Sequence, residues 1–330
     1  MTTELEKMDR FVQAEGALIR KVVSAVETVI VGQQQLLERI LVAMLANGHI
    51  LIEGVPGLAK TTAVKTLARL VDARFQRIQF TPDLLPADLV GTLIYNPREG
   101  VFTTRKGPIF ANIVLADEVN RAPAKVHSAL LEAMEERQVT IGETTYPLDG
   151  LFMVLATQNP IEQEGTYPLP EAQMDRFMMK TSITYPSWDE EREIIRRSAH
   201  AAPLPDVQPL LHPPDILRLR SVVDAIYLDE KIEQYILDIV FATRDLSRCG
   251  LERSAHYVEF GASPRASIYL AMASRALALI RGRAYVVPQD IKDIAPDILR
   301  HRIILSYEAA VDAISTDHLI ADLLAHVRVP

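Results

Sequence analysis

The sequence predicts an α/β protein, with a central parallel sheet flanked by helices in its first half and an all-helical second half. Three short apolar runs predict the sheet: HILIE (49–53), NIVLA (112–116) and LFMVLA (151–156). Runs that are apolar throughout are typical of strands buried on both faces of a parallel sheet. The segments between them are long enough for the helical crossovers that parallel strands need. Strand signals become sparse from Ser187 onward, which predicts the helical second half.

The first half begins with a helix, because residues 17–45 carry apolar side chains at helical spacing. The strand at 49–53 follows, and a Gly-rich loop leads from it into the helical run TAVKTLARL (62–70). The segment MMKTSITY (178–185) reads as a further strand.

The second half begins with a proline-rich connector at 201–215. Five prolines fall in this stretch, which excludes a helix interior there. We therefore place a domain boundary near Pro186, between an α/β domain at 1–186 and a helical domain at 187–330 that includes the connector. Helices are expected in the second domain at 214–227, 229–247, 263–281, 288–299 and 316–327.

Composition narrows the class of protein. A chain of 330 residues, 48% apolar and 24% charged, is long enough for about two globular domains. Its 35 basic and 43 acidic residues give a formal net charge of −8, which disfavours sequence-independent binding to nucleic-acid phosphates. A single cysteine, Cys249, excludes an internal disulfide framework. The N-terminus has no apolar signal core and no run reaches the ~18 residues of a membrane span, so we expect a cytoplasmic protein without membrane insertion.

A phosphate-binding loop is predicted at GVPGLAKT, Gly54–Thr61, between the first strand and the next helix. Backbone N–H groups of such a loop form an anion nest, and the helix N-terminus behind it adds partial positive charge. Lys60 is expected at the β- and γ-phosphates and Thr61 at Mg²⁺. Ala59 replaces the second glycine of the Walker A pattern, and we expect it to adopt helical φ at the start of the helix. The alternative is a Gly/Pro turn followed by a chance Lys-Thr pair.

Polar residues follow the next two apolar runs. Asp117 and Glu118 come after NIVLA, where Asp117 is suited to hold Mg²⁺ and Glu118 to polarise an attacking water. Asn159 follows LFMVLA, at the strand end where ligands bind in parallel α/β sheets. The alternatives are acids that merely solvate a strand end and, for Asn159, a turn residue before Pro160.

Two arginines differ in how much the sequence around them indicates. Arg176 follows Asp175, where a lone arginine is usually a surface ion pair. Arg265 stands in the first turn of a helix that Ser263 caps and Pro264 begins, so its charge opposes the helix dipole. An anion in front of that helix would satisfy both the dipole and the arginine, although a solvated side chain explains Arg265 equally well.

Taken in order, these motifs resemble the AAA+ ATPase superfamily and, within it, the MoxR family. GVPGLAKT is similar to the family's G-x-P-G-x-A-K-T loop, in which an alanine at position 59 is expected. IVGQ (30–33) resembles the box on the adenine side, and the blocks at 115–142 and 157–177 resemble the Walker B and sensor 1 segments. GASPRAS (261–267) resembles the segment that carries sensor 2.

The resemblance, which covers about residues 28–305, implies an ATP and Mg²⁺ site and a P-loop AAA+ core with a C-terminal helical lid. Thr61 and Asp117 are implied as metal ligands, and Glu118 and Asn159 as catalytic residues. Arg176 looks like an arginine finger that acts on a neighbouring subunit's ATP, with Arg121 in reserve, and Arg265 looks like sensor 2. The implied nucleotide contacts are Val31, Gly32, Gly54, Pro56, Gly57, Leu58, Ala59, Lys60, Thr61 and Thr62.

The same resemblance implies an oligomeric ring, usually a hexamer, and two β-hairpin inserts at 95–110 and 137–150. It implies an ATP hydrolase that remodels or matures a protein partner, either one with a von Willebrand A domain or a metal-cofactor protein. The D-x-S-x-S motif of such a domain has its nearest match at 245–249, which ends in Cys249 and so fails. The partner domain is therefore expected on another chain.

Two other functions share this nucleotide site. A nucleic-acid motor could use Arg98, Arg105 and Lys106 of the first hairpin, but the acidic balance and the lack of a basic–aromatic stripe argue against it. A chelatase-type ATPase subunit would need a separate catalytic subunit.

Overall fold

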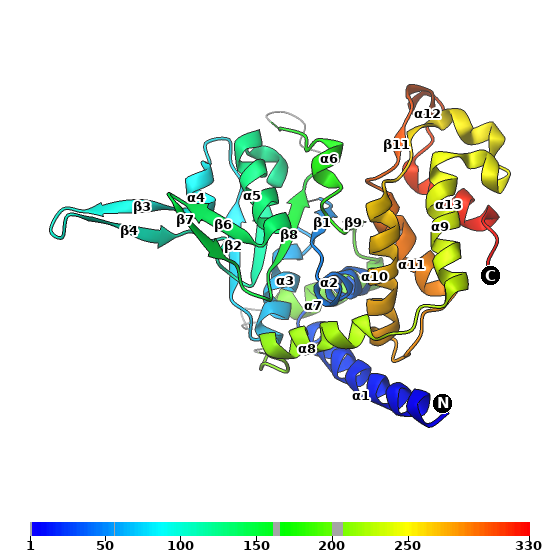
Figure 1. Ribbon diagram of the computed structural model, residues 1–330, viewed down its shortest axis with the longest axis horizontal. Helices are drawn as coiled ribbons and strands as arrows, with labels where there is room; N and C mark the ends of the chain where they lie inside the picture. The colour runs from blue at the N-terminus through cyan, green and yellow to red at the C-terminus, as the bar shows by residue number, and fades with distance from the viewer. Residues whose placement is uncertain (1, 56, 161–165, 200–206) are drawn as a thin grey trace. The chain divides into compact units, whose positions relative to one another are not determined.

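The computed structural model describes residues 2–55, 57–160, 166–199 and 207–330. Its contacts divide the chain into two compact units (Figure 1). The first contains residues 21–177 and 181–217, and the second contains the residues up to Arg20, 178–180 and 218–330. The division into domains at 1–186 and 187–330 stays a prediction. Among the described residues, no helix is both long and apolar enough to cross a bilayer.

A five-stranded sheet organises the α/β part, with the strand order β2-β5-β8-β1-β9 (Figure 1). The pairs β2–β5, β5–β8 and β8–β1 are parallel. The three apolar runs form β1, β5 and β8, as predicted. The edge strand β2 was not predicted, because it buries one of its five residues, Ile78. The strands are β1 (Ile50–Glu53), β2 (Phe75–Gln79), β5 (Ile113–Asp117), β8 (Met153–Gln158) and β9 (Met179–Ser182).

Helices cover both faces of this sheet. On one face, alternate strand residues such as Leu51, Val114 and Val154 form an apolar core with Val126 and Leu130 of α5. On the other face, α3 contacts β2 and β5. The first unit's helices are the end of α1 (Thr2–Glu27), α2 (Gln34–Leu45), α3 (Lys60–Leu70), α4 (Pro86–Val90), α5 (Ala124–Glu136), α6 (Glu171–Met174), α7 (Trp188–Ser198) and the start of α8 (Pro213–Asp224).

The helix predicted over 17–45 is wrong as a single element. The structure has α1 and α2 there, separated by residues 28–33. Gly32 (φ 71°) and Gln33 (φ 58°) adopt left-handed backbone conformations that a continuous helix cannot contain. This break shapes part of the candidate site described below.

Two antiparallel hairpins are present, as predicted. The first pairs β3 (Gly91–Asn96) with β4 (Val101–Lys106), so its arms begin four residues before the predicted range of 95–110. Gly91 (φ 103°) sits at its base, where a Cβ would collide with the carbonyl oxygen of Arg105. The second pairs β6 (Gln138–Ile141) with β7 (Thr144–Pro147).

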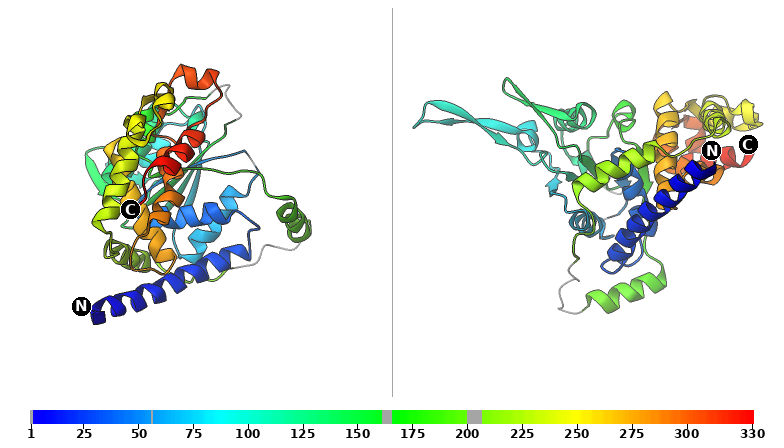
Figure 2. Two further views of the ribbon diagram at one scale, coloured as in Figure 1. Left: turned by 90° about the vertical axis from the view of Figure 1, so that its right-hand side faces the viewer. Right: turned by 60° about the horizontal axis from the view of Figure 1, so that its bottom comes forward.

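The two hairpins lie side by side (Figure 2). The Thr104 and Tyr146 hydroxyls are 2.9 Å apart, so they join β4 to β7 by a hydrogen bond. The ammonium of Lys106 lies 4.8 Å from the ring centroids of both Phe110 and Tyr146. Toward the tip, Tyr95 and Phe102 are exposed, and their rings contact each other at a tilt of 51° with ring centroids 5.2 Å apart.

The second unit is mostly helical, as predicted for a C-terminal lid. Its core packs α10 against α9 and α11, and α13 against α9 and α11. One short antiparallel pair, β10 (Val258–Phe260) with β11 (Ile304–Leu305), interrupts the helices. Ser263 caps α10 and accepts a hydrogen bond from the Arg265 N–H, as the sequence predicts. Besides the start of α1 and the end of α8, its α-helices are α9 (Glu230–Arg244), α10 (Pro264–Ile280), α11 (Pro288–Leu299), α12 (Tyr307–Val311) and α13 (Thr316–His326).

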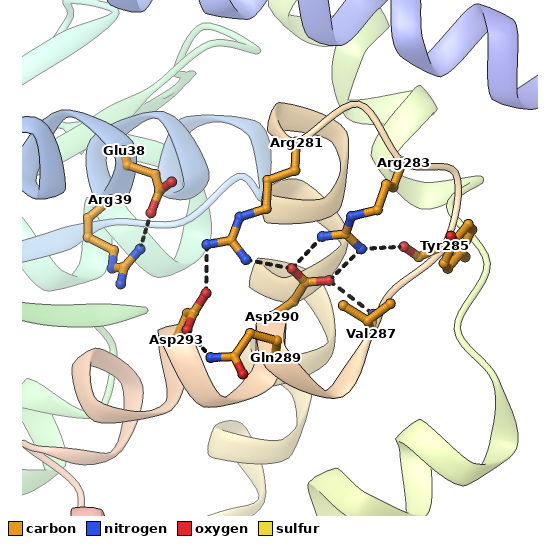
Figure 3. Close-up of polar contacts among 9 residues, drawn as sticks. All are labelled: Glu38, Arg39, Arg281, Arg283, Tyr285, Val287, Gln289, Asp290 and Asp293. Carbon is orange, nitrogen blue, oxygen red and sulfur yellow. Dashed lines mark hydrogen bonds and ion pairs between the residues drawn. The ribbon is translucent and has the colours of Figure 1, made fainter.

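A buried carboxylate joins α10 to α11 (Figure 3). Asp290 is fully buried and accepts hydrogen bonds from Arg281 at 2.9 Å and from Arg283 at 2.6 and 2.9 Å. It also accepts the Val287 N–H at 3.0 Å, at the start of α11. Because a buried carboxylate is stable only when it is paired and hydrogen-bonded, these contacts fix the loop between the two helices.

We predict that Asp290→Ala destabilises the lid by about 3 kcal/mol, because it removes the carboxylate that pairs with the partly buried Arg283 and one of the two that pair with Arg281. The matched control is Asp293→Ala. Asp293 pairs with Arg281, accepts a hydrogen bond from the Gln289 amide and is partly exposed, so its loss costs about 1 kcal/mol or less. Urea denaturation followed by circular dichroism at 222 nm gives both free energies, and equal losses would contradict the role assigned to Asp290.

Candidate nucleotide-binding site

The candidate site lies where three parallel strands end together. Glu53 of β1 is in register with Gln158 of β8, and Ala116 of β5 with Ala156 of β8. The residues that follow these strands, Gly54, Glu118 and Asn159, therefore meet at one edge of the sheet. Ligands of parallel α/β folds bind at this edge.

The loop after β1 has the shape of a phosphate cradle. Gly57 adopts φ 87° and has open space where a Cβ would lie. The Lys60 ammonium donates a 2.6 Å hydrogen bond to the carbonyl oxygen of Gly54, which folds the side chain back over the loop. Burial lowers the pKa of Lys60, and the carboxylates of Asp117 and Glu118 oppose that shift. Pro56 lies outside the described residues.

The expected conformation of Ala59 is wrong. Ala59 is the N-cap of α3 with φ 54° and ψ 20°, in the left-handed region and not in the helical one. A residue with a Cβ is strained there by about 1 kcal/mol or more. The glycine of the general Walker A pattern is thus explained by backbone conformation, and this chain tolerates an alanine in the same strained position.

The acids after β5 have defined partners. The Asp117 carboxylate accepts hydrogen bonds from Arg77 and, at 2.5 Å, from the Thr157 hydroxyl. The Thr157 hydroxyl also accepts the Glu118 N–H at 2.9 Å. Glu118 itself is in the left-handed region (φ 56°), which turns its side chain away from the strand direction toward the site.

The Glu118 carboxylate accepts a 2.7 Å hydrogen bond from the Gln79 amide and a 3.2 Å one from Arg121. Arg121, the reserve candidate for a trans-acting arginine, is thus paired within its own chain. Arg77, Gln79 and Thr157 were not predicted as site residues. The sequence signal for the first two is their alternate spacing on β2, which places both side chains on one face of that strand.

Two adjoining cavities share the lining residues Gly57, Leu58 and Ala59. The first, of about 350 Å³, is lined mainly by polar and charged side chains and brings together most of the predicted phosphate and metal ligands. Its remaining lining residues are Gly54, Lys60, Thr61, Arg77, Asp117, Glu118, Thr157 and Asn159.

The second cavity, of about 200 Å³, is mainly apolar and suits a planar base. The predicted residues Val31 and Thr62 line it, whereas Gly32 (φ 71°) lies against the Glu190 side chain of α7. Ile30 and Gln33, the ends of the predicted box on the adenine side, line it as well. Its remaining lining residues, which were not predicted, are Val29, Pro186, Ile194 and Arg197.

Arg197, which lines this cavity, connects two helices beside it by hydrogen bonds. Its guanidinium donates to the carbonyl oxygens of Glu27 at 3.1 Å and Thr28 at 3.3 Å, and to the Glu193 carboxylate at 2.8 Å. These bonds tie α7 to the end of α1. The sequence gives no signal for this contact, since Arg197 and Glu27 are 170 residues apart.

The two arginine candidates lie elsewhere. Arg176 is not among the residues that line either cavity, and its guanidinium forms a 2.9 Å ion pair with Glu135 at the end of α5. The ion pair that the sequence analysis allowed for Arg176 is thus made with Glu135, on another element. Arg265 lies in the first turn of α10, in the second unit.

A buried histidine supports the turn that follows Glu118. His127 of α5 is 1% exposed, and its Nε2 lies 2.6 Å from the carbonyl oxygen of Val119. Because a carbonyl can only accept, Nε2 carries the proton. Burial lowers the pKa of His127, and its hydrogen bond to Val119 opposes that shift.

Comparison with known proteins identifies both parts of the chain. Residues 49–179 match the model of the ATPase family associated with various cellular activities (AAA), and residues 251–323 match an AAA lid domain. The chain is 50% identical to the chaperone MoxR1 of Mycobacterium tuberculosis over 96% of its own length and 84% of that protein's.

It is 30% identical to the protein MoxR of Paracoccus denitrificans over 98% of this chain and 99% of that protein. Among solved structures, that of a proposed ATPase from Cytophaga hutchinsonii superposes with a TM-score of 0.92 at 51% identity. The superposition covers 100% of this chain and 99% of the solved one.

We predict that His127 makes the stability of the protein fall with decreasing pH. Because its folded pKa lies below the ordinary value of 6.5, the unfolded chain binds the proton first as pH decreases. The free energy of unfolding therefore decreases below about pH 6.5, until the folded histidine also titrates. His127→Gln, which keeps an N–H donor, should show a flatter profile between pH 7.5 and 5 in urea denaturation. Parallel profiles for the two proteins would contradict this contribution.

Proposed function

Because the chain belongs to the MoxR family of AAA ATPases, we propose that it couples hydrolysis of Mg·ATP to the remodelling or maturation of a protein partner. One observation carries the nucleotide part of this proposal: an apolar cavity and a polar one adjoin at the phosphate loop. The apolar cavity suits adenine, and the polar cavity suits phosphates.

The phosphate end of the site is electrostatically prepared for an anion. Lys60 stands in the first turn of α3, where its positive charge opposes the helix dipole. A triphosphate in front of this helix end satisfies the lysine, the dipole and the loop N–H groups together. On binding, the Lys60 ammonium exchanges the Gly54 carbonyl for phosphate oxygens.

The donor set also fits Mg²⁺. Thr61 and Asp117 line the same cavity and offer the hard oxygen atoms that Mg²⁺ prefers, and Mg²⁺ commonly binds one or two protein groups together with substrate phosphates. When bound, Mg²⁺ neutralises charge on the β- and γ-phosphates. Asp117 is held in place by the Thr157 hydroxyl at 2.5 Å.

Glu118 acts as the base that orients and polarises the attacking water. Its left-handed backbone and the Thr157 hydroxyl fix its position, and Asn159 lines the same cavity where the γ-phosphate would lie. The strained backbone of Glu118 supports this role, since such strain concentrates at functional sites.

The remaining proposals concern assembly. The subunits form a ring, in which Arg176 reaches the ATP of a neighbouring subunit and Arg265 contacts phosphate as sensor 2. The partial exposure of the Arg176 side chain, 34%, and its position outside the two cavities support a role in trans over a role in cis. The client is a protein, with a von Willebrand A domain or a metal cofactor as the leading candidates.

The nucleic-acid alternative has weaker support. Of its three hairpin cations, Lys106 already lies over the rings of Phe110 and Tyr146. The net charge of −8 also disfavours phosphate-backbone binding.

We predict that Lys60→Ala abolishes ATP binding, because it removes the cation at the β- and γ-phosphates. Glu118→Gln should bind ATP normally and stop turnover, because the amide keeps the shape of the side chain but cannot accept a proton. Calorimetric titration and a phosphate-release assay measure the two effects. Unchanged affinity in the first variant, or wild-type turnover in the second, would contradict the assignment concerned.

We predict that Arg176→Ala binds ATP normally and slows hydrolysis by roughly 10³-fold or more, as arginine fingers do in other nucleotidases. Mixing it with Lys60→Ala should restore activity, because some interfaces then combine an intact loop from one chain with an intact finger from the other. Sedimentation first establishes that the subunits assemble and exchange.

The matched control is Glu135→Ala, which removes the ion-pair partner of Arg176 but keeps the guanidinium. It should retain hydrolysis if Arg176 is a finger. If Glu135→Ala and Arg176→Ala slowed hydrolysis equally, or if mixed assemblies did not recover hydrolysis, the role of Arg176 would be that of a structural ion pair.

A further inference from the structure

We propose that Arg77 of β2 is a built-in competitor of Mg²⁺ for the carboxylate of Asp117. This inference rests on the proposed function, because it takes Asp117 as the metal ligand. It adds a residue on the edge strand of the sheet to those that control when the site accepts its metal.

Arg77 and Asp117 form an ion pair with two short hydrogen bonds. Nε and Nη2 of Arg77 donate to the same carboxylate oxygen, Oδ2, at 2.9 and 2.6 Å. The other oxygen, Oδ1, accepts the Thr157 hydroxyl at 2.5 Å. Both oxygens of Asp117 are therefore occupied in the structure, one of them by a cation.

Gln79 extends this contact to the second acid. Its side-chain oxygen accepts from Arg77 Nη2 at 3.0 Å, and its amide nitrogen donates to the Glu118 carboxylate at 2.7 Å. Gln79 stands directly opposite Asp117 in the parallel pairing of β2 with β5. Two alternate residues of β2 thus hold both acids from one side.

The two hydrogen bonds from Arg77 occupy both lone pairs of Oδ2, so a metal ion that bonds directly to Oδ2 must displace the guanidinium. Arg77 is free to leave, because its side chain is 49% exposed and β2 is at the edge of the sheet. It lines the same cavity as Lys60 and Thr61, where its guanidinium can pair with nucleotide phosphates.

The competition adjusts the affinity for the metal and does not block binding. Exposed ion pairs are weak, and their measured strength corresponds to a factor of about two to five in a binding constant. Without metal, Arg77 neutralises Asp117 and, through Gln79, helps to orient Glu118. Metal binding then releases Arg77 toward the phosphates.

The test measures metal affinity and not turnover. Protein in excess over ADP is titrated with Mn²⁺ as the probe for Mg²⁺, and free Mn²⁺ is followed by electron paramagnetic resonance. Arg77→Gln should lower the dissociation constant for Mn²⁺ about two- to five-fold. Arg77→Lys keeps the charge but cannot donate both hydrogen bonds. Its dissociation constant for Mn²⁺ should therefore lie between those of Arg77→Gln and the wild type.

Arg74→Gln is the matched control. It removes the same charge just before β2, where Arg74 is 69% exposed and lies 3.6 Å from Asp149. The inference would be overturned if Arg77→Gln and Arg74→Gln had the same dissociation constant for Mn²⁺. It would also be overturned if the dissociation constant of Arg77→Gln exceeded the wild-type value. A wild-type protein that binds no ADP would contradict the proposed function itself. Circular dichroism spectra verify that all variants are folded.

Discussion

The parallel pairing of β1, β5 and β8 is the constraint on which the site depends. Their apolar residues are buried on both faces, so a slip in register would break two cores at once. With the register fixed, the polar residues after each strand meet at one edge. A lysine, a pair of acids and an asparagine that are separated by up to 99 positions in the chain thereby line one cavity.

A second constraint is local backbone strain. Gln33, Ala59 and Glu118 all adopt positive φ; Gln33 and Glu118 each line one of the two cavities, and Ala59 lines both. Such conformations persist only where surrounding contacts hold them. Here the contacts are the helix behind Ala59 and the Thr157 hydroxyl on the Glu118 N–H. Stability is thus given up where the chain must turn toward a ligand.

The sequence predicts the features that follow from continuous patterns. Buried strands, the phosphate loop, the hairpins and the cap of α10 are of this kind. It did not predict β2, because FQRIQ buries a single residue and reads as polar. Nor does it reveal Arg77, Gln79 and Arg197 as site residues, since their contacts depend on strand order and on where α7 folds back. The left-handed conformation of Ala59 has no sequence signal, because alanine is ordinarily a helix former.

One nucleotide is expected to fill both cavities, its base beside residues 29–33 and its phosphates on the loop before α3. Hydrogen exchange measured by mass spectrometry, with and without ADP, shows whether it does. ADP should slow exchange in the peptides that cover residues 29–33 and 57–62, and leave the β3–β4 hairpin unchanged. Exchange that is unaffected in these two segments, or slowed only elsewhere, would contradict this expectation.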